Sequence, residues 1–179
     1  MSRLLITSIL AVCAATVVEA APGDTAHPFM LWTRDEAAAI RKRIETEAWA
    51  KEAYQRLLSE PNSKPFVNLL NYMAFGDEKA GKTERDYLVS FIDQPVDKRG
   101  PDGMNYDKHY DNYVHALRYD VLYDTLSPQQ REGIERTFRK FISHELENPY
   151  RNTRLSLLPN MQLPRLFAAH LMSVALRDE

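Results

Sequence analysis

Apolar and polar positions follow a helical period along most of the chain, and two consecutive segments differ in how many of their sides are apolar. Across residues 113–123 apolar side chains occur on most sides of a helix, which predicts a helix buried on most sides. The next segment begins with Ser127 as an N-cap, Pro128 at the first helical position and Gln130 closing a capping box. Its apolar positions form a single seam, namely Ile134, Phe138, Phe141, Ile142 and Leu146. We therefore expect an enclosed helix followed by one that covers it and faces water.

Helical signals also fill the N-terminal half of the chain. A capping box formed by Thr33 and Glu36 predicts the start of a long helix that reaches about residue 58. Its inward positions drift around the helix and are Ile40, Ile44, Ala48, Trp49, Ala53 and Leu57. A short apolar helix that begins near Phe66 would then stop at Gly76, a residue typical of a helix C-terminus.

Two further helices complete the expected set. Thr83 caps a helix that ends before Pro95, and a last helix runs from Met161 to Leu176 with apolar residues on all sides. One-sided and enclosed helices therefore alternate along the chain. Helical hairpins of this kind build solenoids or closed toroids in which the enclosed members form an inner ring. The sequence predicts an all-α fold made of helical hairpins of an incomplete (α/α) toroid, with inner and outer helices alternating.

The N-terminal residues have the properties of a cleaved export signal. Arg3 gives a positive start, residues 4–18 are largely apolar, and Ala20 precedes the expected cleavage point. We expect a signal peptide at residues 1–20, a secreted or periplasmic protein, and one domain over residues 21–179. Because the chain ends directly after an inner helix, we expect this domain to be the N-terminal portion of a larger toroid.

Composition and charge narrow the classes of partner. A formal charge of −2 over 179 residues argues against a general nucleic-acid or membrane-surface binder, because both need an excess of basic charge. The apolar run near the N-terminus is short for a membrane span, so we expect no stable membrane insertion. The single cysteine, Cys13, lies in the expected leader. The mature chain would then have no disulfide, no thiolate metal site and no cysteine nucleophile.

A first group of candidate binding residues gathers at the start of the enclosed helix. Its members are Tyr106, His109, Tyr110 and Asn112. They would line a sugar-binding cleft or, alternatively, pack at the edge of the core with their polar groups outward. For the later tyrosines of the same helix, Tyr119 and Tyr123, we expect core packing.

A second group is a basic stretch near the end of the chain. The stretch from Asn148 to Arg177 contains no Asp or Glu, but it does contain four arginines and a histidine, namely Arg151, Arg154, Arg165, Arg177 and His170. Such a stretch would form a basic wall facing an anionic ligand, or its arginines would pair with acidic residues of other helices.

Three stretches share a pattern with a known family. They are residues 28–33 before an Arg-rich first helix, residues 119–128 with the helix that follows, and residues 159–162 before an Ala- and Leu-rich helix. Together they resemble the N-terminal part of secreted polysaccharide lyases of the heparinase II/III and alginate lyase type. The resemblance implies an (α/α) toroid whose cleft holds an acidic polysaccharide, followed in such enzymes by a β-sandwich domain.

The resemblance also implies a reaction, β-elimination at a uronic acid, that needs neither a metal nor a redox cofactor. A neutral amide or a cation must first take up charge at the uronate carboxylate, because the C5 proton is otherwise too weakly acidic. Asn160 matches the amide of similar lyases, and Gln162 and Arg165 would assist in carboxylate binding. An Asn at such a position is more often simply a helix N-cap. A tyrosine or histidine base and a tyrosine acid would complete the reaction, and we expect them beyond residue 179.

Two other classes of protein stay open. A glycoside hydrolase on a similar toroid would use two carboxylates, for which the candidates are Asp102, Asp107, Asp111, Asp120 and Asp124. A non-catalytic helical module that binds carbohydrate or protein would need only the fold.

Overall fold

The computed structural model describes residues 27–94, 106–147 and 159–176, without the side chains of residues 106–111 and 159–164. Within these ranges the chain is helical and has no strand, which confirms the all-α prediction. None of the described helices is long and apolar enough to cross a membrane. The expected signal peptide lies outside the described ranges. The elements, in chain order, are α1 (Arg34–Thr46), α2 (Ala48–Ser59), η1 (Pro61–Ser63), α3 (Lys64–Phe75), α4 (Glu78–Ser90), α5 (Tyr106–Leu122), η2 (Tyr123–Thr125), α6 (Pro128–Glu147) and α7 (Pro159–Leu176).

Three helix ends lie where the sequence indicated. Thr33 and Glu36 form a reciprocal capping box at the start of α1. Before α6, the Gln130 backbone N–H donates to the Ser127 hydroxyl at 3.2 Å, and the Ser127 N–H donates to the Gln130 side-chain oxygen at 2.9 Å. α3 ends at Gly76, whose φ of 69° is a left-handed conformation that favours glycine. These predictions are confirmed.

Two other helix boundaries were predicted wrongly. The expected long first helix is two helices, because Glu47 is extended (φ −114°, ψ 122°) and separates α1 from α2. The N-cap of α4 is Asp77, whose carboxylate accepts from the Ala80 N–H at 3.0 Å. Thr83 therefore lies inside α4, where its hydroxyl donates to the Lys79 carbonyl oxygen instead of capping the helix.

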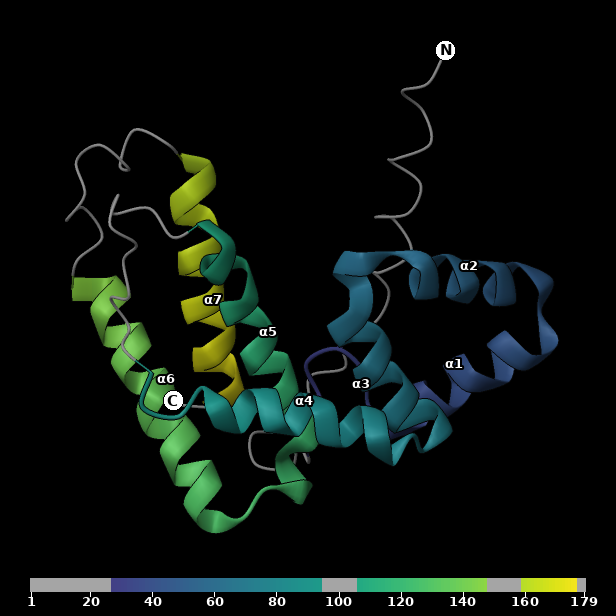
Figure 1. The fold of residues 1–179 in the computed structure, drawn as a ribbon, viewed down its shortest axis with the longest axis horizontal. Coiled ribbons are helices and arrows are strands. Elements are labelled where there is room, and N and C mark those ends of the chain that lie inside the picture. Colours follow the sequence, from purple (N-terminus) through teal and green to yellow (C-terminus); the bar gives the residue numbers. More distant parts are fainter. Residues whose placement is uncertain (1–26, 95–105, 148–158, 177–179) are drawn as a thin grey trace, which may run out of the picture.

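Helices α5, α6 and α7 form a group in which α5 and α7 run in the same direction (Figure 1). α7 packs along α5 and along α6, and α6 runs in the opposite direction to both. α4 contacts α5 and α6 and connects this group to α3. At the other end of the molecule, α1 and α2 form a hairpin whose contacts to the rest of the chain are chiefly with α3.

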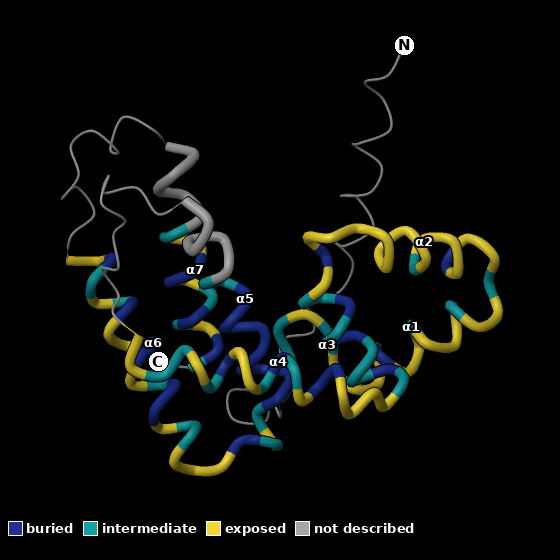
Figure 2. Tube along the Cα trace, viewed as in Figure 1, coloured by how far each residue is buried: buried dark blue, intermediate teal, exposed yellow. Residues whose placement is uncertain are grey.

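The burial of α5 and α6 differs as the sequence pattern predicted. Every residue from Val114 to Leu122 is buried, so α5 is enclosed over its described side chains (Figure 2). α6 buries one face against the core and exposes the other. The main core cluster is formed by Leu88, Ala116, Tyr119, Leu126, Ile134, Phe138, Phe141, Ala168, Ala169, Met172 and Ala175.

One residue of the α6 seam was placed wrongly. Leu146 was expected in the core, but it is 66% exposed. Its neighbour Glu145 is 6% exposed and binds the Arg165 guanidinium of α7. Because adjacent residues of a helix point in different directions, the inward position of Glu145 turns Leu146 to the solvent.

The last helix is enclosed on one side only. Ala168, Ala169, Met172 and Ala175 of α7 are buried against α5 and α6. On the other side Leu166, Phe167 and Val174 are 42%, 51% and 37% exposed. The expectation that α7 is covered on all sides is therefore wrong for this face, which the described elements cover only in part, through the contact of the Phe167 ring with Tyr113 of α5.

The α1–α2 hairpin is also more exposed than its pattern indicated. Trp49 and Leu57 were expected to point inward but are 61% and 44% exposed, and Ala53 is exposed too. Ala37 and Ala50 are the buried residues of the two helices. The structure shows the helical class and the alternating directions of α5, α6 and α7, whereas closure into a toroid remains part of the proposal below.

Candidate functional site

The candidate residues of two separate stretches lie at one end of the α5–α7 pair. Tyr106, His109 and Tyr110 belong to the first turns of α5, and Asn160 and Gln162 belong to the first turn of α7. Because α5 and α7 are parallel neighbours, these turns meet at the same end of the group (Figure 1). The side chains of these five residues lie outside the described part of the structure. The backbone thus brings the predicted residues together without showing their contacts.

The relative height of the two helices follows from a ring contact. Tyr113 of α5 and Phe167 of α7 have ring centroids 6.1 Å apart. Counting back along both helices from this pair places the turn of His109 beside that of Gln162, since both helices rise by about 1.5 Å per residue. Both helices therefore begin at the same end of the pair, and in the view of Figure 1 α7 starts somewhat beyond α5.

Two predicted site residues have described side chains. Asn112 is partly buried in α5. Arg165 of α7 donates from its NH2 group to the buried carboxylate of Glu145, as one of the two interpretations of the basic stretch expected. The Arg165 Nε is buried and has no hydrogen-bond partner among the described residues. His170 is exposed, while Arg151 and Arg154 lie outside the described residues.

A carboxylate at the other end of α5 holds the N-terminal strap, which we define as residues 27–33. Asp120 is 1% exposed and accepts from the backbone N–H groups of Phe29 and Met30 at 3.0 and 2.8 Å. The ring Nδ1 of His27 lies 2.7 Å from the same carboxylate, and the ring stacks on Tyr123 at 4.1 Å. Asp120 therefore fixes the strap. The sequence carried no signal for this contact, because its partners are about ninety residues apart.

A buried ion pair joins α3, α4 and α5. The Arg118 Nε donates to Glu84 at 2.7 Å, and the Asn68 side-chain amide donates to the other oxygen of the same carboxylate at 2.6 Å. The side chains of Arg118 and Glu84 are only 7% and 2% exposed. His115 lies beside Arg118 and stacks on Phe91 at 4.1 Å. Burial, and secondarily the Arg118 charge, lowers the pKa of His115 to about 3, so the ring is neutral near pH 7.

The tyrosines near the end of α5 have structural contacts. Tyr119 is buried and its hydroxyl donates to Glu135 of α6 at 2.6 Å. Burial, followed by this hydrogen bond, raises the pKa of the Tyr119 hydroxyl above its usual range. Tyr123 packs at the edge of the core, between the His27 ring and the guanidinium of Arg131. Core packing is confirmed for Tyr119, which is not suited to act as a base.

The carboxylates needed by a hydrolase are only partly described. Asp120 is engaged by the strap, and Asp124 forms a 2.7 Å ion pair with Arg34. The side chains of Asp102, Asp107 and Asp111 lie outside the described residues. Within the described part of the chain, no group of three or more His, Cys, Asp or Glu residues is arranged to hold a metal ion.

Comparisons of the chain with protein-family models, with curated proteins and with solved structures gave no match. The family resemblance drawn from the sequence therefore stays a prediction. Function has to be argued from the arrangement of the helices and their residues.

Proposed function

We propose that this chain forms part of an (α/α) toroid that cleaves a uronate-containing polysaccharide by β-elimination. The observation that supports this most strongly is the parallel packing of α5 and α7, which begin at the same end. In a ring of helical hairpins the inner helices are parallel neighbours and the outer helices run back between them. α5 and α7 have the positions of inner helices, and the one-sided α6 has that of an outer helix.

An anionic polymer suits the end of the pair at which α5 and α7 begin. The first turn of each helix leaves backbone N–H groups without intrahelical acceptors, and the helix dipole adds partial positive charge there. One helix N-terminus stabilises a nearby anion by about 0.3–1 kcal/mol in exposed sites. Two such termini at one end favour the carboxylates of a uronate chain over a neutral polymer.

Asn160 has the role of charge neutraliser in this proposal. Its position in the first turn of α7 places an amide at the end where the two helices begin. An amide that donates to the uronate carboxylate stabilises the enolate-like intermediate formed when the C5 proton leaves. Gln162, two residues further along α7, would orient the same carboxylate. Tyr106, His109 and Tyr110 on α5 are proposed to line the adjacent sugar subsite, and the general base and acid are expected beyond residue 179.

The resemblance assigned Arg165 to binding of the uronate carboxylate, but we propose a positioning role for it instead. Its bond to Glu145 fixes the guanidinium against α6. We propose that it positions the start of α7 relative to α6. Asn112, which is partly buried nearly two turns below the N-terminus of α5, would support the floor of the subsite.

The test is a product assay on the longest protein that the gene encodes. Incubation with polyuronates should give the ultraviolet absorbance of an unsaturated uronate end. Reducing ends without that absorbance would indicate a hydrolase, and binding without any product would indicate a non-catalytic module. Either of these results would reject the proposed elimination.

The residue-level test compares the activity of two variants, each of which replaces one asparagine by alanine. Asn160→Ala should lower kcat by about 100-fold or more, since removing one donor to a developing oxyanion typically costs that much. The control is Asn62→Ala in η1, which is exposed and remote from α7 and should retain full activity. Circular dichroism should show equal helicity for both variants. Full turnover by Asn160→Ala would reject the neutraliser role.

A further inference from the structure

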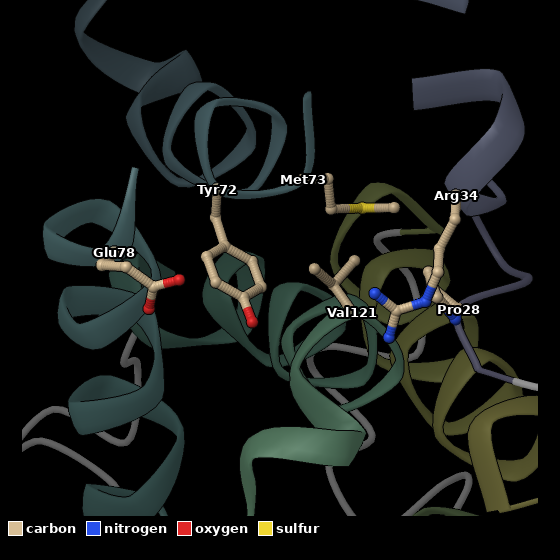
Figure 3. A pocket seen from close by; sticks show the side chains of 6 residues that line it. All are labelled: Pro28, Arg34, Tyr72, Met73, Glu78 and Val121. Carbon is tan, nitrogen blue, oxygen red and sulfur yellow. The ribbon is translucent and has the colours of Figure 1, made fainter. Parts of the chain in front are cut away.

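A pocket lies at the end of α5 opposite to the proposed cleft. It has a volume of about 220 Å³ and is lined by Pro28, Arg34, Tyr72, Met73, Glu78 and Val121 (Figure 3). Val121 is fifteen positions beyond the start of α5, which corresponds to about 22 Å along the helix axis. The pocket is thus separate from the residues assigned to the polysaccharide.

One wall of the pocket is the fixed N-terminal strap. Pro28 belongs to the strap, and Arg34 starts the helix that follows it. Asp120 holds the strap by accepting from the backbone N–H groups of two successive residues, Phe29 and Met30. Charge-assisted bonds to a buried carboxylate are stronger than neutral ones, so this wall is held in one position.

The opposite wall is formed by the corner between α3 and α4. The Tyr72 ring of α3 packs directly on Gly81 of α4, where an added Cβ would overlap the ring. A glycine inside a helix is about 1 kcal/mol less favourable than alanine. Here it allows the ring to fit closely, and Figure 3 shows the Tyr72 hydroxyl between Glu78 and Val121.

The lining combines hydrogen-bond donors and acceptors with a smaller apolar part. The Arg34 guanidinium donates, the Glu78 carboxylate accepts, and the Tyr72 hydroxyl can do both. Met73 and Val121 supply apolar surface between them. A pyranose ring has the same combination, because its hydroxyl groups donate and accept while its C–H groups form an apolar face.

The charge of the pocket argues against an anionic ligand. The NH2 group of Arg34 is 2.7 Å from the Asp124 carboxylate, so its charge is already compensated. The full negative charge of Glu78 then remains on the rim and exceeds the partial positive charge, about half a unit, of the α4 N-terminus. A carboxylate would be repelled here, although solvent and salt weaken the effect at exposed groups.

We propose that this pocket binds a single uncharged pyranose unit. Its ligand differs in charge from the uronate polymer assigned to the other end of α5. The pocket would hold a neutral sugar of a mixed polymer, or a free neutral sugar, while the chain acts elsewhere. The proposal does not depend on catalysis, because it concerns a binding event at residues that the proposed reaction does not use.

The experiment is a titration of the purified chain followed by NMR of methyl groups. Methyl α-glucopyranoside should shift the signals of Met73 and Val121 in a saturable way, with a dissociation constant on the order of 1–10 mM. Sodium glucuronate at the same ionic strength should bind at least about tenfold more weakly, because the Glu78 carboxylate repels the glucuronate carboxylate at short range.

Two conservative variants connect the signal to the pocket. Tyr72→Phe keeps the ring on Gly81 but removes the hydroxyl, and should weaken glucoside binding about two- to tenfold, as for one lost hydrogen bond. The matched control is Tyr87→Phe on the exposed side of α4, which should leave the affinity unchanged. Glu78→Gln removes the rim charge and should narrow the difference between glucoside and glucuronate.

Three results would overturn the proposal. The first is the absence of saturable shifts up to roughly 100 mM glucoside, well above the expected constant. The second is glucuronate binding as tight as that of the glucoside. The third is an equal effect of Tyr72→Phe and Tyr87→Phe on the titration.

Discussion

The α5–α7 group and the α1–α2 hairpin use similar apolar side chains but bury them to different extents. In α5 every residue from Val114 to Leu122 is buried, whereas α1 and α2 each bury a single alanine. α5 is contacted by α3, α4 and α7, and the hairpin packs chiefly on α3. A helix is thus buried on most sides only when neighbours cover it from several directions. We expect the hairpin to be the less stable region.

The largest expected effect contrasts two aromatic residues, one from each region. Phe138→Ala removes a fully buried ring from the main core and should lower the free energy of unfolding by about 3–5 kcal/mol. Trp49→Ala removes a larger ring that is 61% exposed and should cost less than about 1 kcal/mol. Urea denaturation followed by circular dichroism measures both values. Equal losses would contradict the difference in burial.

A smaller effect contrasts two ion pairs. Glu84→Gln leaves the buried guanidinium of Arg118 without its counter-charge and should cost about 3 kcal/mol. Glu52→Gln breaks a pair with Arg56 on the surface of α2, where both side chains are exposed, and should cost less than about 1 kcal/mol. The same urea titrations apply. A loss for Glu84→Gln as small as that for Glu52→Gln would show that the Arg118 charge is not buried.

The third effect is a dependence of stability on pH. The pKa of His115 is about 3 in the folded chain, whereas an unperturbed histidine side chain, as in the unfolded chain, has a pKa of 6.5. The unfolded chain therefore binds a proton at His115 more readily than the folded chain does. Stability should be full above pH 6.5 and fall as the pH drops from there towards 3, by up to about 1.4 kcal/mol per pH unit. Arg118 lies beside the His115 ring and is paired with Glu84. Burial of the ring is therefore the main cause of the lowered His115 pKa, and the Arg118 charge is the second.

Unfolding titrations between pH 5 and pH 7 check this dependence, with a matched pair of variants. His115→Phe should flatten the pH profile between about 6.5 and 5. His170→Gln, at an exposed position of α7, should keep the profile of the unchanged chain. An unaltered profile for His115→Phe would mean that His115 is not the group responsible.

Local signals in the sequence were enough to predict some features of both regions. The capping boxes at Thr33 and Ser127 and the left-handed Gly76 depend on residues close together in the chain. The apolar pattern of α5 was also sufficient, because a helix that is apolar on most sides has to be enclosed. These features required no knowledge of the tertiary structure.

Features decided by distant partners could not be predicted in this way. Glu145 turns inward to bind Arg165, and this exposes Leu146 although its spacing fits the core seam. Asp120 resembles a candidate catalytic acid in sequence, but it binds the strap. Trp49 fits an inward position, yet no described element covers it. In each case the pattern gave the helix, and a contact from elsewhere decided which way the side chain faces.

The sequence predicted where the candidate residues lie in the fold, but it did not predict their contacts. The sequence placed its residues at the starts of two enclosed helices, and the backbone brings those starts to one end. The pocket lined by Arg34, Tyr72 and Glu78 was missed, because its residues come from the strap and from four separate helices. A glycine at an interior helical position, Gly81, was the only local sign of the close packing behind it.

The most direct test of the account is the relative direction of α5 and α7. Nitroxide labels on Lys108→Cys with Gln162→Cys, and on Lys108→Cys with Val174→Cys, can be measured by pulsed electron paramagnetic resonance, with Cys13 replaced by serine. The two α7 positions are about 18 Å apart along the helix axis. The account requires the 108–162 distance to be the shorter one, by roughly 10 Å for helix axes 8–10 Å apart. A shorter 108–174 distance would show antiparallel helices, which would separate the two groups of candidate residues and contradict the proposed cleft.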